Sequence, residues 1–220
     1  MISAIAAPRL SVRKSLLVSV VLSSFLLSAC APLLFGGAVM TGIAASDRRT
    51  AGAQLEDERI ESLSDKRIRD NLGERVHINV TSYNRQALLT GEVPSEQDKL
   101  MAEQLVSKVE NVRTVFNELA VTGLSTLGSR SSDAVVTTRV KANLIDAKDL
   151  SSNAYKIVTE RGVVFLMGRV TAREADRATD LARRTNGVLK VVRIFEMITE
   201  EDLYEMQTPS TPQGKIAPGS

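Results

Sequence analysis

Two stretches of this chain, INVTSYNRQALLTGEV at residues 78–93 and YKIVTERGVVFLMGRV at residues 155–170, are degenerate copies of one pattern. Gly91 and Gly168 align 77 residues apart, and the apolar residues on either side of each glycine align at the same offset. Each copy contains two runs of strand-like composition that are separated by two turn-forming residues. A pattern that recurs at this distance indicates two copies of one structural unit, and it predicts a β-hairpin in each of them.

A helix is expected before each hairpin and another after it. The expected first helices cover about residues 64–73 and 134–146, the second helices about 96–109 and 172–185, and the closing strands 112–121 and 188–198. Ser95 and Thr171 give capping-box-like starts to the second helices. The apolar residues of the two expected first helices align at an offset of 72, whereas the hairpins align at an offset of 77. This difference implies about five additional residues after the first helix of the second copy. The predicted fold class is α+β, with two tandem αββαβ sandwiches that each hold a three-stranded mixed sheet and two helices.

The N-terminus has the features of an export signal. Three bases and no acid occupy residues 1–14, and an uncharged apolar run then extends to Ala29. The run ends in Leu27-Ser28-Ala29-Cys30, which resembles the lipobox of bacterial lipoprotein signals. This resemblance implies cleavage before Cys30 and attachment of an S-diacylglycerol and an N-acyl chain to that residue, and no other cofactor is expected. The alternative is a longer uncleaved anchor, because the next charge is Asp47, although a proline and three glycines disfavour one continuous helix.

The composition divides the remaining chain. The segment TGLSTLGSRSS is a Gly/Ser-rich linker, and the segment after residue 206 has three prolines, two glycines and no hydrophobic period. The predicted organisation is a signal peptide at 1–29, an acylated tether at 30–63, a first domain at 64–121, the linker at 122–132, a second domain at 133–198 and a C-terminal tail at 199–220 that is disordered from about 207.

The repeated unit resembles a known domain. In both copies a strand ends in apolar-x-Gly-x-Val before a capped helix, as in BON domains. Together with the lipobox, the Asp47-Arg48-Arg49-Thr50 stretch and the phrases INVTSY and VFLMGRVTAREA, this makes residues 30–198 resemble the dual BON-domain outer-membrane lipoproteins. The resemblance implies a protein on the periplasmic face of the outer membrane that binds phospholipid and supports the integrity of that membrane, with one relative associated with the division site. Ala31 follows the cysteine where an aspartate would favour the inner membrane, so the same resemblance favours the outer membrane.

The inventory of reactive residues gives no sign of an enzyme. The chain has one histidine and one cysteine, and its sequence contains no GxSxG, GxGxxG, phosphate-loop or HExxH pattern. A single histidine cannot form a two-histidine metal site, and a single cysteine cannot close an intramolecular disulfide. We therefore predict no catalytic residue and no metal site, and we interpret His77 as an ordinary residue at the edge of a strand. Gly91 and Gly168 are interpreted as structural, because glycine at such a strand position permits close backbone approach or a bulge.

Charge is divided unevenly between the two copies. Residues 64–121 carry eight bases and nine acids, a net of −1, whereas residues 130–198 carry thirteen bases and eight acids, a net of +5. An anionic membrane surface would therefore be met by the second copy. The whole chain has a net charge of +2, which does not argue for a nucleic-acid partner. The arginines within residues 173–184 alternate with acids, which favours an ion-paired solvent face over a binding patch.

The first helix of the second copy is the predicted lipid contact. Val136, Val140 and Leu144 recur at helical spacing and are expected to face the sheet. The opposite side and its flanks then give the predicted lipid-binding residues, which are Val135, Thr138, Arg139, Lys141, Ala142 and Ile145. Their expected partners are anionic phospholipids of the phosphatidylglycerol and cardiolipin class. Binding should be shallow, because the chain has no tryptophan to anchor the helix in the interface.

Two other hypotheses use the same domains differently. The helix could contact the first domain or another protein, in which case the tandem domains recruit envelope proteins and the lipid anchor alone provides membrane attachment. A structural role in contact with peptidoglycan is the third hypothesis. Salt-dependent binding of anionic lipid by a fragment without Cys30 separates the first hypothesis from the other two.

Overall fold

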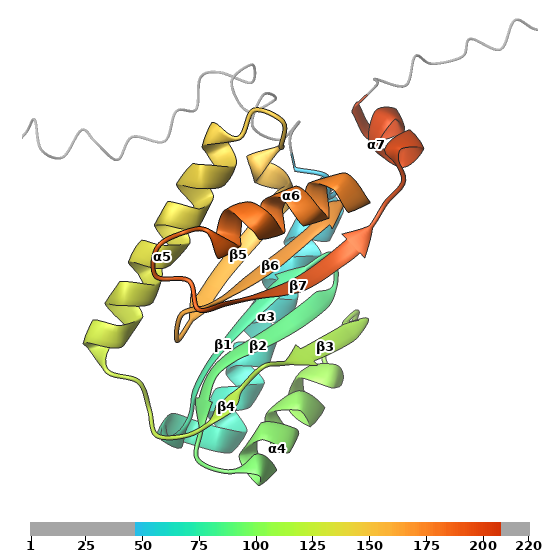
Figure 1. Cartoon of the computed structure of the whole chain (residues 1–220). Coiled ribbons are helices and arrows are strands. Elements are labelled where there is room, and N and C mark those ends of the chain that lie inside the picture. Colours follow the sequence, from blue (N-terminus) through green and yellow to red (C-terminus); the bar gives the residue numbers. More distant parts are fainter. Residues whose placement is uncertain (1–46, 208–220) are drawn as a thin grey trace, which may run out of the picture. The chain divides into compact units, whose positions relative to one another are not determined.

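The computed structural model describes residues 47–207 (Figure 1). The predicted signal peptide, Cys30 and the segment beyond residue 207 lie outside the described residues. Within the described range, no helix is long and apolar enough to span a bilayer.

The order αββαβ is confirmed in both domains. The first domain contains α3 (Ala51–Leu72), β1 (His77–Tyr83), β2 (Gln86–Val93), α4 (Glu96–Ser107), β3 (Thr114–Asn117) and β4 (Ala120–Val121). The second domain contains α5 (Leu127–Asp146), β5 (Tyr155–Glu160), β6 (Val163–Val170), α6 (Ala172–Arg183) and β7 (Lys190–Met197). Short 3-10 turns, η2 (Gly73–Arg75) and η3 (Ser152–Ala154), precede the hairpins, and α7 (Glu200–Gln207) follows β7 in the segment that was expected to be a tail.

Both sheets are mixed, as predicted. β1 pairs antiparallel with β2 and β5 with β6, whereas β3 and β7 run parallel to the central strands β2 and β6. The second sheet has the three strands expected, in the order β5-β6-β7. In the first domain the strand expected at 112–121 is divided into β3 and β4, which both pair with β2, so this sheet has four strands. The Asn117 side chain lies at the break, where its Oδ1 accepts the Leu119 amide at 3.4 Å.

In each domain the two helices cover one face of the sheet (Figure 1). Alternate residues of a strand face opposite sides, so Ala87 and Leu89 of β2 pack under the helices whereas Leu88 points away from them. The residues that point away from the helices form a third apolar cluster shared by the two domains, which consists of Tyr83, Leu88, Phe165, Met167 and Ile194. Both faces of β2 and β6 are thus buried, which explains the nearly continuous apolar run VVFLMG.

Both first helices begin earlier than predicted. α3 starts after the N-cap Thr50 and α5 after the N-cap Thr126, and each threonine hydroxyl accepts the amide three residues further on. Residues 51–63 therefore belong to the first domain rather than to the tether, and residues 127–132 belong to α5 rather than to the linker. The two caps are 76 residues apart, close to the offset of 77 between the hairpins, so the expected insertion of about five residues in the second copy is wrong.

The misalignment is a shift of about one helical turn. An offset of 72 in place of 76 moves the alignment by four residues, and because a helix repeats every ~3.6 residues, the apolar stripes stay in phase. The structure aligns Ile60 with Val136 and Ile68 with Leu144, and all four side chains are buried. Apolar periodicity alone therefore cannot distinguish the two registers.

A buried aspartate from each first helix holds the turn of the following hairpin. Asp57 accepts the backbone amides of residues 84 and 85 at 2.7 and 2.8 Å, and Asp133 accepts those of residues 161 and 162 at 2.8 and 2.9 Å. All four turn residues have a positive φ, between 50° and 73°, which is the geometry of a type I′ turn. The two aspartates are 76 residues apart, so they occupy equivalent positions in the two copies.

Gly91 and Gly168 lie where the central strand passes close to the beginning of its antiparallel neighbour. A Cβ atom at Gly91 would overlap the carbonyl oxygen of His77, and the residue has a φ of 115°. A Cβ atom at Gly168 would lie 2.5 Å from the carbonyl oxygen of Ala154. Close backbone approach, the first of the two roles considered for these glycines, is therefore the one that the geometry supports.

Replacement of Gly91 by alanine should destabilise the protein strongly, because the added methyl group collides with backbone and the residue needs a positive φ. We expect the free energy of unfolding to fall by about 2 to 5 kcal/mol, from overpacking and backbone strain together. Urea unfolding followed by circular dichroism measures the loss. Gly123→Ala is the matched control, since a Cβ atom there meets nothing within 4 Å. Equal urea midpoints for the two variants would contradict this role for Gly91.

Candidate functional site

The residues predicted to contact lipid all lie on α5. This helix runs for 20 residues, and its buried stripe consists of Asp133, Val136, Val140 and Leu144. The three apolar residues of the stripe belong to the core of the second domain, where they pack with residues of β6 and α6. The core thereby fixes which face of α5 points outward.

All six predicted residues are exposed, on the face of α5 opposite the buried stripe. At about 100° per residue, Thr138, Ala142 and Ile145 follow the middle of this face, and Val135, Arg139 and Lys141 flank it. Val135 is 47% exposed and Ile145 57%, so α5 carries apolar side chains on two opposite faces. The inner ones are accounted for by the core, whereas the outer ones are left to solvent or to a partner.

The two cations of this face differ from those of α6. Arg139 donates one weak hydrogen bond to the Asn186 carbonyl at 3.5 Å, and neither it nor Lys141 forms an ion pair within the described part of the chain. On α6 and at its end, Arg173, Arg177 and Arg184 are ion-paired with Glu200, Asp149 and Asp180, respectively. The prediction of an ion-paired solvent face on α6 is thus confirmed for these three arginines but not for Arg183, which forms no ion pair within the described residues. The two cations of α5 are likewise available to an external anion.

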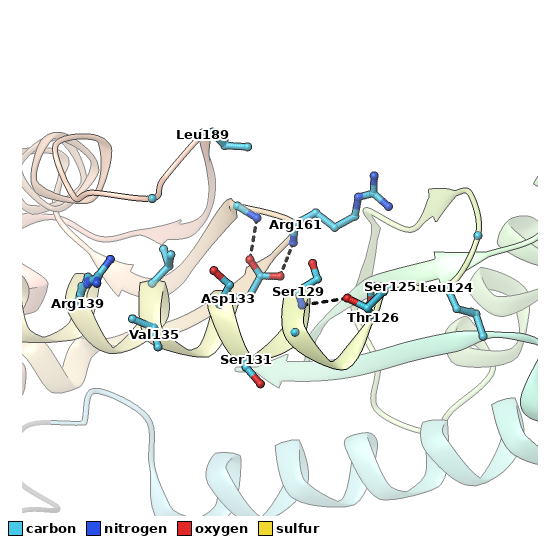
Figure 2. A pocket seen from close by; sticks show the side chains of 16 residues that line it. Leu124, Ser125, Thr126, Ser129, Ser131, Asp133, Val135, Arg139, Arg161 and Leu189 are labelled. Carbon is cyan, nitrogen blue, oxygen red and sulfur yellow. Dashed lines mark hydrogen bonds between the residues drawn. The ribbon is translucent and has the colours of Figure 1, made fainter.

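Sequence reasoning missed several residues beside this face. A hollow at the start of α5 is lined by Val135 and Arg139 together with Leu124, Arg161 and Leu189 (Figure 2). Leu124 is 50% exposed and Leu189 81%. Leu127, which begins the helix and lies on its outward face, is 80% exposed. Leu124 and Leu127 could have been noticed in the sequence, because they are two leucines in an otherwise polar linker. Nothing in the sequence near Leu189 indicated that this residue would lie beside α5.

The Asp47–Thr50 stretch ties the start of the first domain to the second domain. Both terminal nitrogens of Arg48 donate to the carboxylate of Glu174 at 2.7 Å, and Nη1 also donates to the Arg169 carbonyl at 2.7 Å. The Arg169 side chain returns a hydrogen bond to the Arg48 carbonyl at 3.1 Å. The Arg48 and Glu174 side chains are 6% and 4% exposed, so this is a buried, bidentate ion pair. We call these contacts the Arg48 latch.

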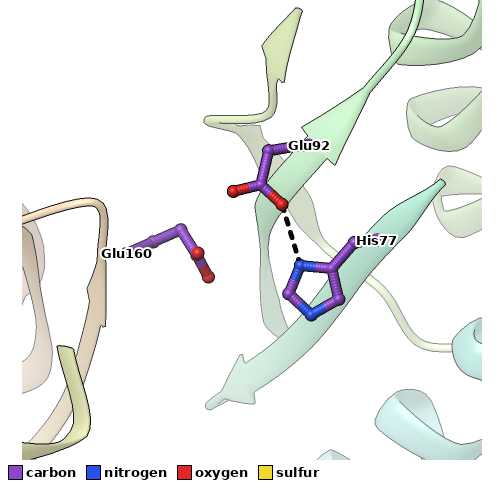
Figure 3. A group of neighbouring side chains, drawn as sticks. All are labelled: His77, Glu92 and Glu160. Atoms are coloured by element: carbon purple, nitrogen blue, oxygen red, sulfur yellow. Dashed lines mark hydrogen bonds and ion pairs between the residues drawn. The ribbon is translucent and has the colours of Figure 1, made fainter. Parts of the chain in front are cut away.

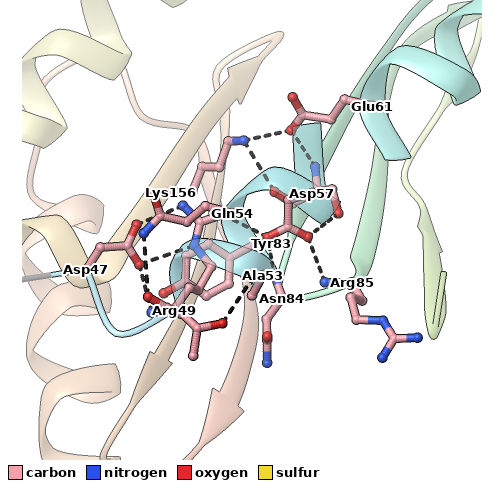
Figure 4. A network of polar contacts seen from close by, with 12 residues as sticks. Asp47, Arg49, Ala53, Gln54, Asp57, Glu61, Tyr83, Asn84, Arg85 and Lys156 are labelled. Atoms are coloured by element: carbon pink, nitrogen blue, oxygen red, sulfur yellow. Dashed lines mark hydrogen bonds and ion pairs between the residues drawn. The ribbon is translucent and has the colours of Figure 1, made fainter. Parts of the chain in front are cut away.

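Arg49 turns the other way and completes a polar network with the first domain (Figure 4). It donates to Asp47 and to the turn-holding Asp57, each at 2.8 Å, and its guanidinium lies 4.4 Å from the ring centre of Tyr83. Tyr83 donates to the Ala154 carbonyl of the second domain at 3.2 Å. Burial and the negative charge of Asp47 raise the pKa of Tyr83 to about 12, so its hydroxyl keeps its proton at neutral pH.

A third group of side chains joins the two domains elsewhere. His77 Nδ1 lies 3.0 Å from Glu92 Oε2, and the Glu160 carboxylate of the second domain lies close to both (Figure 3). The interpretation of His77 as an ordinary strand-edge residue is therefore incomplete, because it is half-buried and paired with a fully buried carboxylate.

Comparison with known proteins matches each repeat separately. The BON domain model matches residues 56–123 and 132–197. The chain is 34% identical over 178 residues to the outer membrane lipoprotein DolP of Haemophilus influenzae, covering 80% of this chain and 92% of that protein. It is 32% identical over 158 residues to a 21 kDa hemolysin of Actinobacillus pleuropneumoniae, covering 69% and 79%, respectively. A solved structure of CdsD, a structural protein of the type III secretion system of Chlamydia trachomatis, aligns with 72% of this chain and 99% of the CdsD chain. The identity is 13% and the TM-score is 0.29, so no conclusion about fold or function is drawn from this likeness.

The two helix-covered mixed sheets and the match of each to one domain model define a protein with two BON domains. The chain belongs to the BON-domain family, and within it this is a dual BON-domain protein similar to DolP. The first match begins inside α3, which agrees with the longer first helix that the structure shows.

The Arg48 latch should depend on pH through Glu174. Burial alone would raise the pKa of Glu174, but hydrogen bonds from Arg48 and the Thr171 amide outweigh burial and hold this pKa below its usual value of 4.5. A carboxyl group with a lower pKa in the folded than in the unfolded state stabilises the fold above the unfolded pKa. That stabilisation is lost as the pH falls through the folded pKa.

Arg48→Ala should therefore lower the free energy of unfolding by about 3 kcal/mol at neutral pH, because it leaves a buried carboxylate without its cation. The difference from the wild type should shrink as the pH falls below 4.5, since a protonated Glu174 gains little from the arginine. Urea unfolding across this pH range measures both effects. Arg59→Ala is the control, because its pair with Glu110 is exposed and should contribute less than about 1 kcal/mol. A gap that stays constant with pH would argue against the ion pair.

Proposed function

We propose that this protein is a non-enzymatic outer-membrane lipoprotein that binds anionic phospholipid through its second BON domain. We propose further that it supports outer-membrane integrity, with the division site as its place of action. The relative from Haemophilus influenzae is described as an outer membrane lipoprotein, and the lipobox that ends in Cys30 agrees with such an anchor. The lipid contact is assigned to the outward face of α5.

The combination of exposed apolar groups and cations without ion pairs on one helix face carries this assignment. Leu127, Val135 and Ile145 are 80%, 47% and 57% exposed, and all three lie on or beside the outward face. Arg139 and Lys141 lie between the ends of this row and have no ion-pair partner among the described residues. Apolar groups that enter the acyl boundary and cations that meet phosphate groups are the two components of interfacial helix binding.

The corrected domain limits strengthen the electrostatic argument. With α3 included, residues 51–121 carry nine bases and thirteen acids, a net of −4, whereas residues 127–198 carry thirteen bases and eight acids, a net of +5. An anionic bilayer would therefore repel the first domain and attract the second. This difference favours α5 over α3 as the membrane contact, although the two helices occupy equivalent positions in the repeat.

The dimensions of α5 fit a helix that lies along the membrane surface. Leu127 and Ile145 are 18 residues apart, which corresponds to about 27 Å along the axis. An apolar side chain contributes at most about 1.5 to 3 kcal/mol when it is fully buried. The chain has no tryptophan, so the expected insertion is shallow and the expected affinity is modest.

Sedimentation with lipid vesicles tests the proposal. A fragment of residues 47–207, which lacks the acylated Cys30, should bind vesicles that contain phosphatidylglycerol or cardiolipin at low salt and bind them less at higher salt. A variant with Arg139→Glu, Lys141→Glu and Ile145→Asp should bind at least about 30-fold more weakly, since the two lost cations alone account for about 2 kcal/mol. All three positions are exposed, so circular dichroism should show an unchanged fold.

The matched control carries the same charge change elsewhere. Arg177→Glu, Arg184→Glu and Leu100→Asp alter two ion-paired arginines and an exposed leucine outside α5. This variant should lose much less vesicle binding than the α5 variant, because it leaves the α5 face intact. Equal losses in the two triple variants would mean that net charge, not the α5 face, determines binding. A complete lack of binding at low salt would leave the acyl chains as the only membrane contact and favour the adaptor hypothesis.

A further inference from the structure

Three ionisable side chains from both domains converge at one point of the domain junction. His77 lies at the start of β1 and Glu92 near the end of β2, while Glu160 ends β5 of the second domain (Figure 3). One ligand atom from each residue can be chosen so that all three atoms lie within 4.8 Å of one another. An imidazole nitrogen and two carboxylate oxygens at this separation resemble the donor set of a divalent metal site.

The buried carboxylate of Glu92 is only half satisfied. Its Oε2 lies 3.0 Å from His77 Nδ1 and accepts the Ser125 hydroxyl at 3.2 Å. Its Oε1 is buried and has no hydrogen-bond partner among residues 47–207, and the residue as a whole is 0% exposed. In Figure 3 this oxygen lies on the side of Glu92 that faces Glu160. An unpartnered carboxylate oxygen in the interior is costly, and a cation bound beside this oxygen would offset that cost.

The local charges point in the same direction. Arg130 lines the same hollow as His77 and Glu160, but it donates to the Ser125 hydroxyl at 3.1 Å and forms no ion pair with either glutamate within the described residues. Asp133, which lines the same hollow, is occupied by two turn amides. Two carboxylates therefore share a single imidazole.

We propose that His77, Glu92 and Glu160 form a binding site for a divalent transition-metal ion, for which Zn²⁺ is the best match. Zinc accepts imidazole and carboxylate ligands at about 2.0 to 2.2 Å, with water completing a tetrahedral shell when the protein provides three ligands. Such bonds place ligand atoms about 3.3 Å apart. The three ligand atoms within 4.8 Å of one another approach this separation.

Two neighbouring side chains would hold the ligands in place. Ser125 donates to Glu92 Oε2, and Asn79 donates to Glu160 at 3.4 Å. Hydrogen bonds of this kind orient metal ligands and strengthen binding. Because two ligands come from the first domain and one from the second, the ion would bridge the domains and stabilise their junction. This role is independent of phospholipid binding.

Isothermal titration calorimetry tests the proposal on the full-length chain in detergent. Cys30 is the one cysteine of the chain, and once it is S-acylated as predicted it has no free thiol to compete for the ion. Zn²⁺ should bind at one site and raise the unfolding temperature, and Co²⁺ should give the visible absorption of a tetrahedral ion. His77→Gln and Glu160→Gln should each weaken Zn²⁺ binding at least about tenfold, since even the loss of a residue that supports a ligand costs about 10- to 100-fold.

Glu196→Gln is the matched control, because Glu196 is another carboxylate of the domain junction and contacts Asn84 and Arg169 instead. It should leave zinc affinity unchanged. Failure of Zn²⁺, Co²⁺ and Mn²⁺ to bind saturably would overturn the proposal, as would zinc binding that survives both substitutions. If His77→Gln lowers the unfolding temperature of the metal-free protein while zinc has no effect on the unsubstituted chain, the group is an ion pair only and the proposal fails.

Discussion

The packing of the two sheets against each other is the constraint on which the rest of the structure depends. Leu88 of β2 and Phe165 and Met167 of β6 are at most 3% exposed, because each domain covers the apolar sheet face that the helices of the other leave open. Each domain also has a core of its own between its sheet and its helices. A single BON domain of this chain would nevertheless expose a contiguous apolar face to water, and such faces favour association. Each domain therefore buries the sheet face of the other that its own helices leave uncovered.

Charged groups around this apolar contact are removed from water and must find partners inside the protein. The Arg48 latch meets this requirement fully, since one guanidinium faces one carboxylate through two hydrogen bonds. The group formed by His77, Glu92 and Glu160 does not, because two carboxylates face one imidazole and one oxygen has no donor. This difference explains why a cation is inferred at the second place and not at the first. The Arg48 latch also shows that the residues just before α3 are part of the fold and not only a tether.

The features that follow from local periodicity were predicted correctly from the sequence. These are the hairpins, the αββαβ order and the inward stripe of α5, because alternation and helical spacing are visible in short windows. The alignment of the two first helices was wrong because a shift of four residues leaves a helical stripe almost in phase. The Arg48 latch was missed because its partner Glu174 lies 126 residues away, and His77 and Glu160, which the fold brings close together, are 83 residues apart. The exposure of the six predicted residues on α5 is established, whereas their binding of lipid stays a prediction.

The Arg48 latch also helps to explain how a weak lipid contact could keep α5 on the membrane surface. Arg48 is 18 residues from Cys30 and binds the second domain, so the chain that leads from the predicted anchor meets the protein at the basic domain and not only at the acidic one. An acylated Cys30 would hold Arg48, and with it the second domain, within at most about 60 Å of the bilayer. Binding of α5 would then be an intramolecular event with a high effective concentration, so modest affinity would keep the helix on the surface. A durable anchor and a weak, charge-dependent contact would thus be complementary, because the first would retain the protein at the membrane and the second would orient it there.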